Sequence, residues 1–293
     1  MENILSNIGT QFAAVEKIEK QLFDVVKLKL NTGLEGYNVP KHYGVFKGTG
    51  GDCFGIVGDV YEPTQPKLIL SSLVECAASS DVDFSQINYT EHKGGKMIRF
   101  DAPIGKISFK NMRGIEDESI VKLNVQTGFD GHTKTTMFLT TYRMICANGM
   151  KATKTEFAVS YKNVKGNVGK VLSMCEAVSQ AVSQQDQLKE LYTHLNSIKV
   201  GQKEVNDFLL KVTGLDQAQY NEMNAAKRKR LDAINESVAI EFNRTGATAF
   251  GLLNGITHYT NHVVDAENRQ DYLYIDSGVE LNDKALKFAL ELS

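Results

Sequence analysis

A cysteine and an arginine lie within one apolar run at residues 141–150, which read TYRMICANGM. A cysteine reacts as a nucleophile only as a thiolate, and the thiolate needs a base or a cation nearby. Alternate side chains of a β-strand point to opposite faces, so Cys146 shares a face with Phe138, Tyr142 and Met144. In such apolar surroundings a thiol stays protonated, unless a base distant in the sequence approaches it. We therefore expect a structural cysteine, and we predict no catalytic residue and no enzymatic activity.

Arg143 belongs to the opposite face of the same expected strand, together with Leu139 and Thr141. A charged group among apolar neighbours is costly unless it is paired or reaches a polyanion. One interpretation is a salt bridge, for which Glu156 on the next expected strand is a candidate partner. The other is contact with a phosphate, and the sequence leaves both open.

The segment 143–170 is far more basic than the whole chain. It holds six Lys and Arg residues and one acid, Glu156, which gives +5, whereas the chain has 33 basic and 35 acidic residues and a net charge of -2. Cations along a groove, with aromatic rings for base stacking, favour single-stranded nucleic acid. A solvated lysine-rich hairpin has the same composition, so this alternative stays open. The candidate contacts are Arg143, Lys151, Lys154, Phe157, Tyr161, Lys162, Lys165 and Lys170.

A second basic run, KRKR at residues 227–230, lies in an expected helix whose apolar stripe includes Leu231, Ile234 and Val238. The basic side chains mostly fall on the other side of this helix. They form either a solvated surface or a second contact with the phosphates of a nucleic acid. This set consists of Lys227, Arg228, Lys229 and Arg230.

Two histidines, His258 and His262, are one helical turn apart and could share a metal ion. A helical metalloprotease motif would carry a glutamate after the first histidine, but Tyr259 stands there. No carboxylate or cysteine cluster supplies an obvious third ligand. We therefore predict no metal and no cofactor. Asp130, in TGFDGH, precedes a glycine and is expected to form a turn.

Hydrophobic periodicity predicts strands in the first half of the chain and helices in the second. This is an α+β arrangement, with antiparallel hairpins packed with helices over 1–165 and a mainly helical region over 166–293. The two regions could be separate domains or one continuous domain. Asn148-Gly149 is expected to be a turn. Strands are expected at 43–60 (a hairpin), 87–91, 96–102, 107–110, 121–126, 135–146 and 155–161, and helices at 1–30, 68–78, 168–198, 202–213, 216–242, 246–264 and 282–291.

The bulk composition is that of a globular protein, with 42% hydrophobic residues and 23% charged residues. The near-neutral net charge gives no overall attraction to nucleic acid or to a membrane, so a polyanion site would have to be a local basic patch. No apolar run approaches the roughly 18 residues of a membrane span. The N-terminus lacks the features of a signal peptide. The four scattered cysteines favour reduced thiols in a cytoplasm.

Four segments of the chain resemble a family of phage and plasmid proteins, the domain of unknown function family nine-three-two. The most specific is the turn, strand and Arg-x-x-Cys-x-Asn element at 127–150. At 157–163 many members of that family carry a His-Thr pair, but this chain has Tyr161-Lys162, so no role of that histidine is carried over. The segments are FGIVGDVYEPTQ (54–65), TGFDGHTKTTMFLTTYRMICANGM (127–150), FAVSYKN (157–163) and GATAFGLLNGITHYTNH (246–262).

The resemblance implies a protein encoded by a phage or another mobile element and acting in the cytoplasm of a bacterial host. In outline the family is similar to single-strand annealing proteins of the Red-beta, RecT and Rad type, which form rings or filaments. This implies a homo-oligomer that binds and anneals single-stranded DNA in recombination or replication, with no membrane partner. The alternative is a structural or regulatory phage oligomer that binds proteins and has no affinity for nucleic acid.

Overall fold

The structure is a computed structural model that describes residues 13–31, 33, 38–80, 85–144, 148–151, 158–167, 174–216, 218–219 and 222–292. The chain forms two compact units, and three long strands pass from one unit to the other. Unit 1 comprises Met1–Ile104, Lys122–Leu139 and Lys154–Val182, and unit 2 comprises Gly105–Val121, Thr140–Thr153 and Ser183–Ser293.

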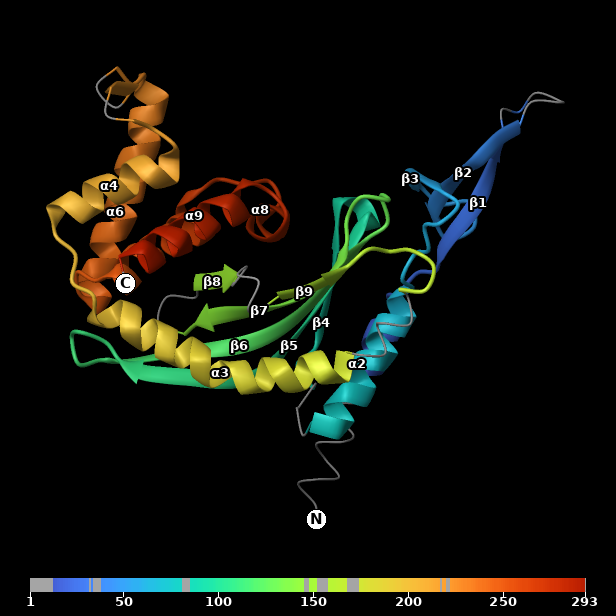
Figure 1. Cartoon of the computed structure of the whole chain (residues 1–293), viewed down its shortest axis with the longest axis horizontal. Coiled ribbons are helices and arrows are strands. Elements are labelled where there is room, and N and C mark those ends of the chain that lie inside the picture. Colours follow the sequence, from blue (N-terminus) through green and yellow to red (C-terminus); the bar gives the residue numbers. More distant parts are fainter. Residues whose placement is uncertain are drawn as a thin grey trace, which may run out of the picture. The chain divides into compact units, whose positions relative to one another are not determined.

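A three-stranded antiparallel sheet lies in unit 1, with the strand order β1-β2-β3 (Figure 1, blue). Its strands are β1 (Val25–Asn31), β2 (Asn38–Lys47) and β3 (Cys53–Gly58). The chain turns between β2 and β3 through Gly48 and Gly50, whose φ angles of 63° and 84° suit glycine far better than other residues. The hairpin predicted for this segment is confirmed.

A larger antiparallel sheet has the order β4-β5-β6-β7-β8, and β9 also pairs with β7. The strands predicted at 96–102 and 107–110 are one continuous strand, β5. The strand predicted at 121–126 begins earlier, because the charged residues 116–118 also lie inside β6. The strands are β4 (Asn88–His92), β5 (Met97–Lys110), β6 (Glu116–Gly128), β7 (Thr135–Arg143), β8 (Asn148–Lys151) and β9 (Ala158–Tyr161).

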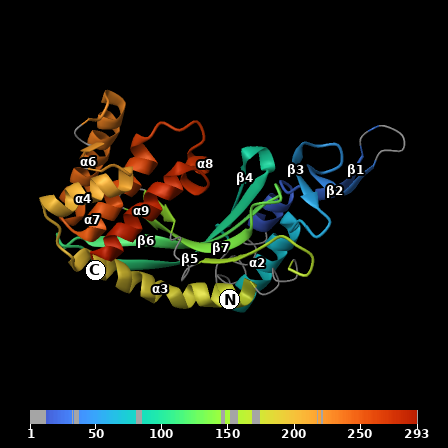
Figure 2. The ribbon, with the colours of Figure 1, turned by 45° about the horizontal axis from the view of Figure 1, so that its top comes forward.

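Helices dominate the second half of the chain, so the predicted α+β class is confirmed. In unit 2 the helices α4, α6, α7 and α9 pack against one another (Figure 2). No helix in the described part of the chain is both long and apolar enough to cross a membrane. The helices are α2 (Pro66–Ser80), α3 (Met174–Ser197), α4 (Gln202–Thr213), α6 (Ala225–Thr245), α7 (Ala249–His258), a π-helical turn at Tyr259–Val263, α8 (Arg269–Tyr274) and α9 (Ser277–Glu291).

The prediction of one helix over residues 1–30 is wrong at its end. Residues 13–19 are helical, but Val25–Asn31 forms strand β1. The sequence VVKLKLN alternates apolar and basic residues, a pattern of period two that suits a strand. Hydrogen bonding to a neighbour stabilises this strand, because β2 pairs antiparallel with β1 along nearly its whole length.

The turn predicted at Asn148-Gly149 is also wrong, because both residues lie in strand β8 and pair with Arg143 and Tyr142. Cys146 lies outside the described residues. The face of β7 that Cys146 was expected to share is exposed to solvent at this end, because Tyr142 is 38% exposed and Met144 is 50% exposed. Beyond Thr141, only the strand face that carries Arg143 stays buried.

Candidate functional site

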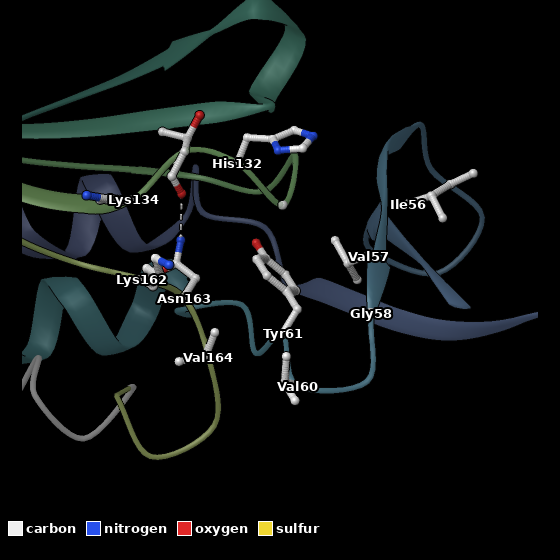
Figure 3. A pocket seen from close by; sticks show the side chains of 12 residues that line it. Ile56, Val57, Gly58, Val60, Tyr61, His132, Lys134, Lys162, Asn163 and Val164 are labelled. Atoms are coloured by element: carbon white, nitrogen blue, oxygen red, sulfur yellow. Dashed lines mark hydrogen bonds between the residues drawn. The ribbon is translucent and has the colours of Figure 1, made fainter. Parts of the chain in front are cut away.

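A cavity of about 440 Å³ opens in unit 1, a volume within the range of small-ligand pockets. Three chain segments line it: residues 56–61 with the end of β3, residues 131–134 after β6, and residues 162–164 after β9. In Figure 3 the Tyr61 ring stands in the middle, with Val57 and Val164 on opposite sides. The positions of these three segments therefore determine the shape of the cavity.

The first segment is held by side chains that bond to backbone groups. Lys27 donates from Nζ to the carbonyl oxygens of Asp59 (2.9 Å) and Tyr61 (2.6 Å). The Gln65 amide bonds to both the N–H and the carbonyl of Val25, at 3.0 and 2.9 Å. The Tyr61 hydroxyl donates to the Gly128 carbonyl at 3.3 Å, and burial raises the pKa of this phenol. Tyr61 is therefore a neutral, fixed part of the cavity wall.

The second segment is a tight turn closed by its own carboxylate. Asp130 Oδ1 accepts from the backbone N–H groups of His132 (2.9 Å) and Thr133 (2.8 Å), and Oδ2 accepts from the Thr133 hydroxyl (2.9 Å). Burial alone would raise the pKa of Asp130, but these hydrogen bonds outweigh it and lower the pKa. The predicted turn is confirmed, and both carboxylate oxygens of Asp130 accept hydrogen bonds within it.

Glycines let this turn approach strand β3 closely. A Cβ atom at Gly55 of β3 would stand 2.8 Å from the Asp130 carbonyl oxygen. A Cβ atom at Gly131, whose φ is +84°, would stand 2.7 Å from a methyl carbon of Val57. The stacked rings of Phe54 and Phe129, 5.7 Å apart, fill the space beneath. The side of the cavity formed by β3 and the turn is therefore rigidly packed.

Asn163 joins the third segment to the other two. Its Oδ1 accepts from the hydroxyls of Thr64 (3.1 Å) and Thr135 (2.6 Å). Its Nδ2 lies within hydrogen-bond distance of Thr127 Oγ1 (3.3 Å) and of the carbonyl oxygens of Gly128 and Thr133, both at 3.1 Å. The side chain is 3% exposed, so these bonds form without competition from water. Asn163 is the structural centre of the cavity.

The basic side chains that line the cavity are His132, Lys134 and Lys162. Among the residues that the structure describes, no acidic residue lines it, and Lys165 is exposed one residue beyond its edge. Within the described part of the chain, neither Lys134 nor Lys162 forms an ion pair. The cavity can thus attract an anion, and its walls of Val57, Val164 and Tyr61 offer apolar contact.

Of the residues predicted from the basic segment, Lys162 lines the cavity and Lys165 lies close to it. Tyr161 is only 9% exposed, and burial raises the pKa of its hydroxyl to about 12. Its ring therefore has no open face for a base in this conformation. Lys154, Phe157 and Lys170 lie outside the described residues, and only the backbone of Lys151 is described. Their roles stay predictions.

Arg143 lies in unit 2, where it is buried in an ion-pair cluster. Its Nε donates to Asp117 Oδ1 at 2.6 Å and its Nη2 donates to Asp117 Oδ2, a bidentate arrangement. Its Nη1 donates to Glu241 Oε2 at 2.6 Å, and Glu241 also accepts from Arg244 at 2.7 Å. The guanidinium carbon lies 5.7 Å from the centre of the Phe250 ring.

These contacts favour the salt-bridge interpretation of Arg143 over a phosphate contact. The partners differ from the expected Glu156, which lies outside the described residues. Asp117 and Glu241 are fully buried, and Arg143 is 3% exposed. Two cations and two carboxylates balance to zero in this group, which we call the Arg143 cluster. A phosphate could reach Arg143 only by displacing its partners.

The KRKR run begins helix α6 and is exposed throughout. Asn224 caps this helix by accepting from the N–H of Lys227 at 2.9 Å, and the first turn has no acidic residue. Cations near a helix N-terminus oppose the helix dipole, at about 0.3–1 kcal/mol each. Within the described part of the chain, none of these four residues forms an ion pair, although the hydrogen bond from Lys284 and, to a lesser extent, the charge of Arg230 lower the pKa of Glu280. The four are Lys227, Arg228, Lys229 and Arg230.

The histidine pair lies at the end of α7 and in the π-helical turn, with ring centroids 5.1 Å apart. Burial lowers the pKa of His258, an effect partly offset by the charge of Glu241. Nearby polar side chains bond to carbonyls of their own helix, as Asn254 does to Phe250 and Asn261 to Thr257. The described residues contain no group of three or more His, Cys, Asp or Glu side chains that could hold a metal.

The sequence alone did not identify His132, Lys134, Tyr61 or Asn163 as site residues. One signal was present: three of the four segments that resemble a known family, 54–65, 127–150 and 157–163, contribute eleven of the twelve residues that line the cavity. Segments far apart in sequence that share a family pattern often meet at one place in the fold. The sequence alone does not show that these segments meet at one cavity.

The chain has an antiparallel α+β fold with an open cavity lined by basic side chains. A comparison with family models shows the family. Residues 53–286 match the domain of unknown function (DUF932), and the chain belongs to this family. No curated protein and no solved structure matches the chain significantly.

Proposed function

We propose that this protein binds single-stranded DNA and anneals complementary strands, as a homo-oligomer and without covalent chemistry. One observation carries the proposal: the cavity of unit 1 gathers the basic residues His132, Lys134 and Lys162, with no acidic lining residue among those that the structure describes. A site that recruits phosphates needs unpaired cations at an accessible surface. The cavity meets that requirement, and the Arg143 cluster does not.

The basic start of α6 supports the same proposal in unit 2. Lys227 and Arg228 are exposed in the first turn of α6, where cations oppose the helix dipole and slightly destabilise the helix. Binding of a polyanion would offset the cost. Lys165 adds a further exposed cation in unit 1. Lys151, Lys154 and Lys170 belong to the same proposal through their sequence positions alone.

The annealing step and the role in phage or plasmid recombination come from the resemblance to annealing proteins. Annealing requires that a strand be held by its backbone while its bases stay open to a partner strand. Cationic contacts to phosphates hold a strand in this way. The proposed place of action is the cytoplasm of a bacterial host, where such strands are produced during replication.

The test is fluorescence anisotropy of a labelled single-stranded oligonucleotide at rising salt. We expect submicromolar binding at low salt that weakens linearly on a log–log plot, because each phosphate contact releases counterions. The charge reversals Lys162→Glu and Lys229→Glu should each weaken binding, whereas Lys203→Glu, an exposed lysine on α4, should not. Absence of binding at low salt would contradict the proposal.

A second function, protein interaction within a phage oligomer, is supported by one face of the small sheet. Leu28, Gly44 and Ile56 are cross-strand partners and share that face. Leu28 is 46% exposed and Ile56 is 62% exposed, although both are strongly apolar. If this face alone mediates function, Leu28→Lys, which does not touch the cavity, should dissociate an assembly seen by mass photometry, while charge reversal at the cavity should change nothing.

A further inference from the structure

We propose that the cavity of unit 1 clamps a phosphate of the bound strand between Lys134 and Lys162 and does not read base identity. This inference rests on the proposed function and assigns its central contact. The ligand class is the phosphodiester backbone of a single strand. Three features of the cavity support it: the register of the two lysines, the hydrogen bonds of the remaining polar groups, and the chemistry of the walls.

The two lysines follow the last paired residues of two neighbouring strands. In the antiparallel ladder of β7 and β9 the final pair is Thr135 with Tyr161. Continuing that register by one residue places Lys134 opposite Lys162, and both line the same cavity. Like charges directly opposite each other on neighbouring strands are destabilising. An anion between the two ammonium groups would remove this repulsion.

Asn163 prevents the two lysine backbones from separating. Thr133 and Thr135, which flank Lys134, both bond to the Asn163 side chain, at 3.1 and 2.6 Å. Asn163 itself directly follows Lys162. The repulsion between the lysines is therefore opposed by a buried network. A built-in repulsive pair held by a rigid frame is typical of a functional site.

The other polar groups of the cavity are already used. Asn163 Oδ1 accepts two hydrogen bonds, and its two N–H hydrogens are shared among three acceptors. Both oxygens of Asp130 accept bonds within the turn, and the Thr133 hydroxyl donates to one of them. The Tyr61 hydroxyl donates to Gly128. These groups have little capacity left to read the edge of a base.

The groups that remain free are chemically suited to phosphate. A lysine ammonium group has three donors and no acceptor, so it binds phosphate oxygens as a point charge. Val57, Val60 and Val164 offer only apolar contact to a sugar or a base. Among the described lining side chains, the exposed His132 imidazole still offers a ring donor and a ring acceptor. One imidazole does not supply the bidentate contacts that discriminate among bases. Binding at this site should therefore be the same for different base sequences.

The experiment compares the wild-type protein with Lys134→Gln/Lys162→Gln on oligothymidylate, oligodeoxyadenylate and oligodeoxycytidylate of one length, by anisotropy at several salt concentrations. We expect the double variant to bind all three probes on the order of tenfold more weakly at low salt, with a salt slope smaller by about 0.7 for each phosphate that the variant no longer neutralises. Lys67→Gln, an exposed lysine of α2 in the same unit, serves as the matched control and should bind like the wild type. Thermal unfolding verifies that each variant is folded.

Three results would overturn the inference, and they separate it from the proposed function. If the wild type binds all probes and the double variant binds them equally well, the cavity does not hold the strand, while the proposed function stands. If the double variant loses affinity for one base composition only, the cavity reads bases. If the wild-type protein binds no probe, both the inference and the proposed function fall.

Discussion

The cavity of unit 1 and the Arg143 cluster of unit 2 differ in how their positive charges are balanced. Arg143 and Arg244 are neutralised by Asp117 and Glu241, both fully buried. The lysines of the cavity have no ion-pair partner among the described residues and are exposed. In the segments that resemble the family, a basic residue paired with buried carboxylates thus supports the fold. A basic residue without such a partner is available for binding.

The two regions should also differ in what they contribute to stability. The Arg143 cluster joins β6, β7 and α6 through buried ion pairs. Removal of Arg143 would leave uncompensated buried charge, which is strongly destabilising. Exposed lysines contribute little to the free energy of unfolding. Substitutions in the first region should therefore affect folding, and substitutions in the second should affect binding. Five variants test this contrast.

The largest effect is expected for Arg143→Leu. It leaves Asp117 and Glu241 buried without their main partner, which should cost about 3–5 kcal/mol in the free energy of unfolding. Denaturant unfolding followed by circular dichroism measures this loss. The control is Arg113→Leu, an exposed arginine of unit 2 that donates one bond to the Phe242 carbonyl. A folded Arg143→Leu protein of normal stability that has lost DNA binding would reverse our assignment of Arg143.

A smaller loss is expected for Asn163→Ala, which removes the structural centre of the cavity. The buried Gly128 carbonyl and the partly buried Thr133 carbonyl would lose a donor, at about 1–3 kcal/mol in total. Asn167→Ala is the matched control, because Asn167 makes one exposed bond to the Lys162 carbonyl. Equal unfolding free energies for the two variants would show that the network does not hold the cavity.

Acid should weaken the two units in different pH ranges. The lowered pKa of His258 means that the unfolded state binds a proton more readily than the native state. Its contribution to stability is therefore complete above the unfolded pKa of about 6.5 and declines as the pH falls below it. Replacing His258 with Gln should flatten the stability curve between about pH 6.5 and pH 5. An unchanged slope in that range would contradict this role.

Asp130 of unit 1 should respond only at lower pH. Because its pKa is lowered in the folded protein, its contribution is present above the unfolded value of about 3.9 and is lost as the pH falls through the folded pKa. The difference in melting temperature between the wild type and Asp130→Asn should therefore shrink below about pH 4. A difference that is constant from pH 7 to pH 3 would disprove this assignment.

The smallest effect is expected for Lys162→Gln, and its sign is informative. Removing one of two like charges that lie across from each other should stabilise the free protein by about 0.2–0.5 kcal/mol at low salt, and less at high salt. Denaturant midpoints at two salt concentrations measure this difference. Destabilisation would indicate that Lys162 has a structural partner and would weaken the case for an anion site.

Much of the fold could be predicted from the sequence, because periodicity directly reports which face is buried. The limits of α4 (Gln202–Thr213) and the hairpin of β2 and β3 agree with prediction. The errors lie where a local signal competes with pairing. Asn148-Gly149 has a strong turn propensity, yet pairing with β7 draws it into a strand. Residues 25–31 follow an apolar helical pattern, but their own period-two alternation and their pairing with β2 make them a strand.

The candidate site was less predictable, because it depends on contacts between distant segments. Lys162 was identified from local charge, but its neighbour Lys134 stands in a segment that appeared to be only a turn and a strand. The partners of Arg143 lie 26 and 98 residues away in the sequence. Charge density indicates where cations gather in the sequence. It does not indicate which of them are neutralised in the fold.

The most direct test of this contrast is hydrogen–deuterium exchange of the full-length protein with and without a single-stranded oligonucleotide at low salt. We predict that the peptides covering residues 56–61, 131–134 and 162–165 become protected when DNA binds. The peptides containing Asp117, Arg143 and Glu241 should exchange at the same rate in both states. Protection around Arg143 without any change at the cavity would contradict the account.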